Sequence, residues 1–319
     1  MTHRITRSTP SSRVSAVTAL ILLVALAAAP VWASSAQMLL MGEFFIYLAL
    51  ACLWNLLAGY AGLVSIGQQA YVGLGGYVLF TLSLILGIHP LLAIPVVGLI
   101  SAVFSIPVAA LVFRLQGAYL VGQTTGLGGG SGISLPTQVT GQLGRKALRE
   151  ASISWVALAL GAGCLALVYT LLRSRICLVL TAIRDSEIAS ASLAVPIAKV
   201  KYGVYIFAAG MTAMIGALIS LQKLRISRGA VISVNDWTAF VIFIVVIGGI
   251  GTIGGLIIGS IVYFLLREFI ANFGSIYLFF LGSLAIVVIL VTPKGIWGYV
   301  SGRFGWSLFP VGHRITWKD

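Results

Sequence analysis

The fold is decided by residues 44–113, which contain no Asp, Glu, Lys or Arg and read FFIYLALACLWNLLAGYAGLVSIGQQAYVGLGGYVLFTLSLILGIHPLLAIPVVGLISAVFSIPVAALVF. A transmembrane helix needs about 20 mostly apolar residues, so this stretch alone has the length of about three. Its runs are continuously apolar rather than alternating, which favours helices over the strands of a membrane barrel. Residues 44–113 therefore predict an all-α membrane protein.

The composition of the whole chain supports this prediction. The 319 residues are 60% hydrophobic and 8% charged, with a mean hydropathy of +1.09. Soluble domains carry about 25% charged residues, so a soluble enzyme, a disordered chain and a disulfide scaffold are excluded. We expect a polytopic protein with about 8–10 transmembrane helices. The predicted segments are 14–33, 38–58, 71–87, 91–113, 152–172, 202–221, 237–249, 254–267 and 275–292.

The first segment, 14–33, follows Arg4, Arg7 and Arg13 and ends in a small residue, as a signal peptide does. Its apolar core is longer than the usual 7–15 residues, and further segments follow it. We therefore predict an uncleaved first helix.

Basic residues set the expected orientation. The net charge of +13 would suggest nucleic acid in a soluble protein, but here Lys and Arg lie between apolar runs. We expect contacts with membrane lipid and no nucleic-acid partner. Positive charge concentrates in the tail 1–13, the loop 173–201 and the tail 294–319. These three segments are predicted to be cytoplasmic and to flank or interrupt a transmembrane domain over 14–293.

Counting crossings from a cytoplasmic N-terminus brings residue 114 back to the cytoplasm. Segment 152–172 would then deliver the basic loop 173–201 to the wrong face, so one further crossing is needed between Arg114 and Ser152. We predict that Arg145, Lys146 and Arg149 face the periplasm. The glycine-rich run inside this stretch is expected to be held by protein rather than lipid.

Two glycine-punctuated breaks resemble each other, GYAGLVSIG at 59–67 and GGIGTIGG at 248–255. Paired broken helices are typical of transporters built from internal repeats, with the solute route at the repeat interface. The predicted substrate-pathway residues are Ser65, Gln68, Gln69, Gly248, Gly249 and Gly251. The alternatives are close helix packing at the glycines and interhelical hydrogen bonds from the two amides.

The basic loop contains apolar residues at helical spacing, which predicts one amphipathic helix over 176–196 that ends at Pro196. Its mixed charges favour docking into a groove of a partner protein over lying on lipid headgroups. The predicted docking residues are Ile183, Arg184, Asp185, Glu187 and Ile188.

Residues for chemistry are few. His3, His89 and His313 are far apart in sequence, and neither a nucleotide loop nor a catalytic motif is present. We expect no enzymatic activity, no metal and no cofactor, so any ATP is hydrolysed by another chain. Glu43, Asp236 and Glu268 stand at segment edges and are interpreted as interfacial residues.

Four segments resemble the branched-chain amino acid ABC importer permeases of the LivM type: LWNLLAGYAGLVSIGQ at 53–68, RLQGAY at 114–119, TAIRDSEIA at 181–189, and the glycine-rich residues 248–259. The resemblance implies a permease subunit in the bacterial inner membrane. Its implied partners are a second permease subunit of the LivH type, ABC ATPase subunits and a periplasmic solute-binding protein. Residues 181–189 would be its coupling segment to the ATPase.

Related permeases import urea, short amides or aromatic acids, so the solute class stays open. The rival classes are a stand-alone secondary transporter or channel and a structural membrane subunit. Members of the family usually carry a further helix between the positions matching Tyr119 and Thr124. This chain lacks it, in the same stretch where the crossing count fails. The sequence thus points to a compacted or impaired permease.

Overall fold

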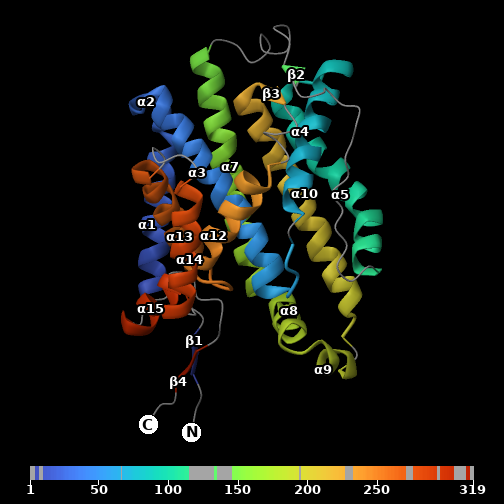
Figure 1. Cartoon of the computed structure of the whole chain (residues 1–319), viewed down its shortest axis with the longest axis vertical. Coiled ribbons are helices and arrows are strands. Elements are labelled where there is room, and N and C mark those ends of the chain that lie inside the picture. Colours follow the sequence, from blue (N-terminus) through green and yellow to red (C-terminus); the bar gives the residue numbers. More distant parts are fainter. Residues whose placement is uncertain are drawn as a thin grey trace.

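The structure is a computed structural model that describes residues 4–6, 10–65, 67–114, 133–134, 146–193, 195–226, 233–270, 276–292, 295–304 and 314–316. Its helices run largely along the long axis of an elongated bundle, as Figure 1 shows. They are α1 (Pro10–Ala27), α2 (Ala29–Trp32), α3 (Ser35–Asn55), η1 (Leu56–Tyr60), α4 (Gln68–Ile85), α5 (Pro90–Arg114), α7 (Lys146–Arg173), α8 (Arg175–Asp185), α9 (Glu187–Ser192), α10 (Ile197–Lys223), η2 (Asn235–Ala239), α12 (Phe240–Gly248), α13 (Ile253–Ile270), α14 (Ile276–Val291) and α15 (Gly295–Phe304). Both η elements are π-helices.

Two short antiparallel ladders accompany the helices. Strand β1 (Arg4–Thr6) pairs with β4 (Arg314–Thr316), which joins the two tails of the chain. Strand β2 (Ile133–Ser134) pairs with β3 (Arg225–Ile226), directly after α10. The expectation of an all-helical membrane fold is confirmed in its substance, since these strands are two or three residues long.

Among the described residues, five helices are long and apolar enough to cross a membrane: Ser35–Tyr60, Pro90–Ala110, Ala147–Arg173, Ile197–Lys223 and Phe279–Arg303. The pair Asp236–Gly248 and Ile253–Phe269, bent by 120°, makes a sixth if it is one broken span. The prediction of 8–10 covers the whole chain, whereas this number covers the described residues alone, and the prediction also included short segments such as 237–249 as separate spans. The thirteen residues Asp236–Gly248 extend only about 20 Å, less than the roughly 30 Å of a bilayer core.

The first segment also differs from its prediction. In place of one helix over 14–33, α1 ends at Ala27 and the single-turn α2 begins at Ala29, with Pro30 in its first turn. Proline has no backbone N–H to donate and favours the first turn of a new helix over the interior of an old one. Ser34 and Gln37 then form a capping box that starts α3.

The core lies where α10 packs against α4 and α5, and where α3 packs against α7. Helix α10 approaches α4 so closely that a Cβ on Gly216 would lie 2.2 Å from the carbonyl oxygen of Val72. Such an approach requires glycine.

The bundle has two distinct ends. Helix α5 is antiparallel to α10, because Gly98 lies against Met214 while Ala102 lies against Gly210. Arg114 therefore lies towards the end of the molecule that holds α8 and α9, whereas β2 lies beside β3 at the opposite end (Figure 1). Arg114 and Ile133 thus lie at opposite ends of the bundle, while the additional passage predicted between Arg114 and Ser152 stays a prediction. The connecting residues 115–132 lie outside the described residues, as does the predicted position of the missing helix.

Arg149 lies at the β2–β3 end, because it lines one cavity with Ser35 and Leu224. Arg184 lies at the other end, beside Gly59. The strand pair of the two tails extends from this same end in Figure 1. The described parts of the three basic segments therefore lie at one end of the bundle.

Candidate functional site

The two glycine breaks of the sequence meet in space. The first is η1 with the described residues 61–65 after it, and the second is the turn between α12 and α13. The side-chain oxygen of Asn55, at the end of α3, accepts from Gly251 N–H at 2.8 Å. The Tyr60 hydroxyl donates to the Gly251 carbonyl at 2.6 Å, and the Asn55 amide donates to the Thr252 carbonyl at 3.5 Å. We call Asn55, Gly59, Tyr60, Gly251 and Thr252 the break junction.

Glycine is needed on both sides of the break junction. A Cβ on Gly59 would lie 2.8 Å from the Gly251 nitrogen and 2.6 Å from the Asn55 Oδ1. Gly251 has a φ of +79°, which L side chains rarely adopt. At the break junction the backbones of the two glycine breaks are therefore in direct contact, with no room for a side chain between them.

The loop between α7 and α10 reaches this junction through Arg184. Its guanidinium donates to the Gly59 carbonyl at 2.8 Å. That carbonyl lies at the end of a helix, where unpaired oxygens and the helix dipole attract a cation. The same guanidinium pairs with Asp185 at 2.9 Å, and its Nη1 is 3.7 Å from where a Cβ on Gly251 would lie. One side chain of the predicted coupling segment thus lies against both glycine breaks.

The single helix predicted over 176–196 is wrong, because the structure forms α8 and α9 with a break at Ser186. Ser186 is extended (φ −158°, ψ 108°), and its hydroxyl accepts from the backbone of Ala189 at 3.2 Å. A serine that caps a new helix competes with continuing the old one. Glu187, at the start of α9, pairs with Lys201 of α10 at 2.8 Å.

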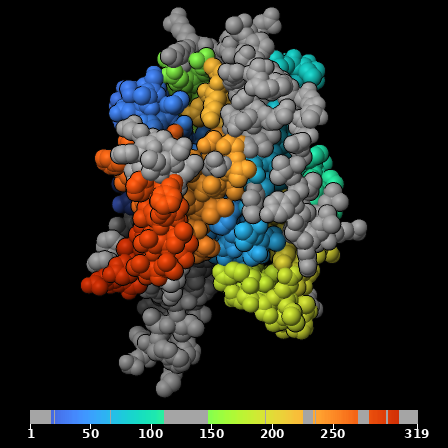
Figure 2. All heavy atoms as spheres, viewed as in Figure 1, coloured from blue at the N-terminus to red at the C-terminus, as the bar shows by residue number. Residues whose placement is uncertain are grey.

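The apolar residues of this loop face two ways. Cys177, Leu180 and Ile183 are buried within the chain. Burial raises the pKa of the Cys177 thiol, and the positive charge of the nearby Arg184 offsets only part of this rise. Leu178, Ile188 and Leu193 are exposed by 71%, 86% and 77%, and Figure 2 shows this yellow-green surface at one end of the molecule. Ile183 is therefore not accessible to a partner protein, although the predicted apolar stripe included it. Ile188 is accessible to a partner.

The predicted pathway amides lie deeper in the bundle, in the first turn of α4. Gln68 donates to the Leu50 carbonyl at 3.1 Å, and its buried oxygen has no hydrogen-bond partner within the described residues. Gln69 accepts a hydrogen bond from the Thr238 hydroxyl of η2. Leu50 precedes Asn55 by five residues, so the amides stand about 7.5 Å along α3 from the break junction. They form a second polar group, separate from the first.

The remaining predicted pathway residues serve the chain's own contacts. The Ser65 carbonyl accepts from the Trp54 indole at 2.9 Å. A Cβ on Gly248 would lie 2.1 Å from the Gly255 carbonyl oxygen, so α12 and α13 pack closely there. Gly249 has a φ of +118° and forms the turn. Their part in a solute route stays a prediction.

Sequence reasoning missed Asn55, Tyr60 and Thr238. The first two belong to the segment at 53–68 that carried the resemblance. An asparagine in an uncharged run that long is a detectable signal, because a buried amide in a membrane needs partners. Nothing in the sequence says that those partners come from residues 251 and 252.

Two of three comparisons with known proteins found matches. The family described as branched-chain amino acid transport system / permease component matches residues 36–291. The high-affinity branched-chain amino acid transport system permease protein LivM of Salmonella typhimurium is 25% identical, over 79% of this chain and 67% of its own length. LivM of Escherichia coli is 26% identical over the same shares. No solved structure matches. The chain belongs to the permease component family of branched-chain amino acid transport systems.

Proposed function

We propose that this chain is a permease subunit of a bacterial ABC importer that moves branched-chain or related amino acids across the inner membrane. The proposal includes ATPase subunits, a LivH-type second permease and a periplasmic solute-binding protein as partners. Its family membership and its resemblance to the two LivM proteins support this assignment. The tails 1–13 and 294–319 and the loop 173–201 are proposed to be cytoplasmic, flanking or interrupting the membrane domain 14–293. Their position at one end of the bundle supports this orientation.

The contact of Arg184 with the Gly59 carbonyl is the observation that carries the mechanism. An ATPase that moves α8 and α9 pulls on this bond, and Asn55 and Tyr60 pass the movement to Gly251. Hydrogen bonds to charged groups contribute about 1.5–3 kcal/mol each, enough to bias two arrangements of the helices. Both broken helices then move together, which opens and closes a route between them.

The test is ATP dependence in reconstituted vesicles. We expect leucine uptake by the assembled transporter to vanish when the partner ATPase is inactivated. Uptake that continues on a proton or sodium gradient alone would identify a secondary transporter and reject the proposal.

The exposed face of α8 and α9 supplies the proposed docking contact for the ATPase. We expect Ile188→Asp, at a position 86% exposed, to abolish co-purification of the ATPase while leaving the thermal stability of the chain unchanged. A charge buried at an interface without a partner costs several kcal/mol of docking free energy. Ile183→Asp is the contrasting variant, since its buried charge destabilises the chain itself. Normal co-purification of the Ile188→Asp chain would show that this face does not bind the ATPase.

A further inference from the structure

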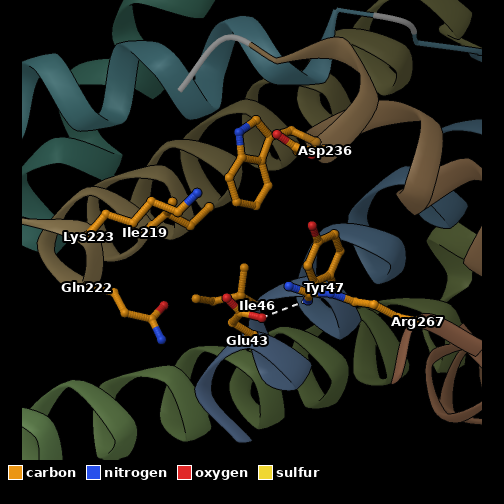
Figure 3. Close-up of a pocket in the computed structure, with 9 residues that line it drawn as sticks. Glu43, Ile46, Tyr47, Ile219, Gln222, Lys223, Asp236 and Arg267 are labelled. Carbon is orange, nitrogen blue, oxygen red and sulfur yellow. Dashed lines mark hydrogen bonds and ion pairs between the residues drawn. The ribbon is translucent and has the colours of Figure 1, made fainter. Parts of the chain in front are cut away.

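A cavity of about 120 Å³ lies at the end of the bundle opposite the break junction. Figure 3 shows charged side chains of both signs around it: Glu43 from α3, Lys223 from α10, Asp236 from η2 and Arg267 from α13. Two acids and two bases give the lining no net charge. The sequence interpretation of Glu43 and Asp236 as separate interfacial residues did not place them in one site.

The four charged side chains differ in whether they form an ion pair within the chain. Glu43 and Arg267 pair with each other at 2.7 Å. The Lys223 ammonium lies 5.0 Å from the centre of the Trp237 ring, a cation–π contact. Within the part of the chain that the structure describes, no carboxylate pairs with Lys223 and no cation pairs with Asp236. The cavity thus offers one available cation and one available anion beside an internally paired couple.

We infer that this cavity binds the ammonium and carboxylate groups of a zwitterionic α-amino acid on its way into the permease. Lys223 takes the carboxylate, and Asp236 takes the ammonium, through charge-assisted hydrogen bonds. A lining with no net charge matches a ligand with no net charge, so a singly charged solute leaves one group of the cavity unpaired.

The size and the walls of the cavity fit this ligand group. A volume of 120 Å³ is about that of four water molecules in the liquid, enough for the two charged groups with the side chain pointing outward. Tyr47 and Trp237 stack with ring centres 5.8 Å apart and form an aromatic wall. Such a wall suits the first carbons of the side chain where it leaves the cavity.

The predicted pathway amides lie close to the lining of the cavity. The π-helix η2 places Asp236, Trp237 and Thr238 consecutively, and the Thr238 hydroxyl donates to Gln69. Along α3, Glu43 precedes Leu50, the partner of Gln68, by seven residues, or about 10 Å. On the inferred route, Gln69 and Gln68 would follow the cavity and precede the break junction.

This inference rests on the proposed function, and it is tested by binding rather than by uptake. The probe is radiolabelled leucine, added to the permease–ATPase complex in nanodiscs without the solute-binding protein. The competitors are isoamylamine, which lacks the carboxylate, and isovalerate, which lacks the ammonium. We expect leucine to bind the wild-type complex at least tenfold more tightly than either competitor.

The variants are Lys223→Met and Asp236→Asn, with Lys223→Arg to restore the charge and Glu268→Gln as a matched control outside the cavity. Lys223→Met should reduce leucine binding at least tenfold and remove the preference for leucine over isoamylamine. Asp236→Asn should remove the preference for leucine over isovalerate. Lys223→Arg should recover binding, and Glu268→Gln should bind as the wild type does. A variant that is merely misfolded would lose binding of all three probes together. It would not show a selective loss of preference for one probe.

Absence of leucine binding to the wild-type complex, or unchanged preferences in both variants, would overturn the inference. Either result leaves ATP-dependent leucine uptake, measured separately with the solute-binding protein, as the test of the proposed function. The two failures are therefore distinguishable.

Discussion

The break junction and the charged cavity lie at opposite ends of one helix, α3, and they differ in the residues that form them. Asn55, at the break junction, is twelve residues and about 18 Å from Glu43, at the cavity. The break junction consists of glycine backbone and neutral donors with no space between them. The cavity consists of four charges around an open volume. The difference fits the two proposed tasks: the neutral, close-packed contacts are proposed to transmit movement, and the available charges of the cavity to recognise a solute.

The largest expected effect comes from adding one methyl group at the break junction. Gly59→Ala places a carbon 2.8 Å from the Gly251 nitrogen, so the two breaks must separate. We expect uptake to fall to background and the free energy of unfolding to drop by about 1–3 kcal/mol. Transport assays and denaturation of the purified chain measure the two effects.

Gly67→Ala is the matched control for that substitution, because a Cβ there meets nothing within 4 Å. It should transport as the wild type does. Equal behaviour of the two variants would show that the close approach at Gly59 is not required.

The second effect separates movement from recognition. Arg184→Met removes the bond to the Gly59 carbonyl while leaving Ile188, the proposed apolar docking contact, and the cavity unchanged. We expect leucine binding and ATPase co-purification to persist, and uptake per ATP hydrolysed to fall at least tenfold. Arg175→Met, at an exposed position of the same helix, is the control. Full coupling in the Arg184→Met transporter would remove this residue from the mechanism.

A smaller effect is expected from Tyr60→Phe, which deletes only the hydroxyl that donates to Gly251. The Gly251 carbonyl loses a partner, so the chain should lose about 1 kcal/mol of stability. Tyr299→Phe, at a position 58% exposed, should change stability little. A Tyr60→Phe chain as stable as the wild type would mean that the 2.6 Å contact contributes nothing net.

The smallest expected effect is that of salt, and it sharpens the contrast between the two regions. The Debye screening length shortens from about 10 Å at 0.1 M salt to about 3 Å at 1 M salt. Leucine affinity at the charged cavity should therefore weaken by about two- to threefold over this range. The stability difference caused by Tyr60→Phe should stay constant over the same range, because neutral groups make that contact. A salt-independent leucine affinity would argue against recognition by charge.

Much of the fold was predictable because it depends on local patterns. Apolar runs of sufficient length predicted the helices, and the glycines at 59–67 and 248–255 predicted where two of them break. The positions of basic residues predicted a further passage after Arg114, and the pairing of β2 with β3 at the opposite end of the bundle agrees with it. The orientation of Ile183 was not predictable from spacing, since an amphipathic helix does not state whether its apolar face meets its own chain or another.

The sequence by itself determined that this chain is a helical membrane protein, where its helices break and which loop carries the mixed charges. Each of these features depends on neighbouring residues and on the free energy of transfer from water to lipid. Only the tertiary structure decided that Asn55 bonds to residue 251, that Arg184 reaches Gly59 and that Glu43 pairs with Arg267. These contacts join residues 125 to 224 positions apart. Such distances are closed by how helices pack, and side-chain spacing along one helix carries no information about which other helix will lie beside it.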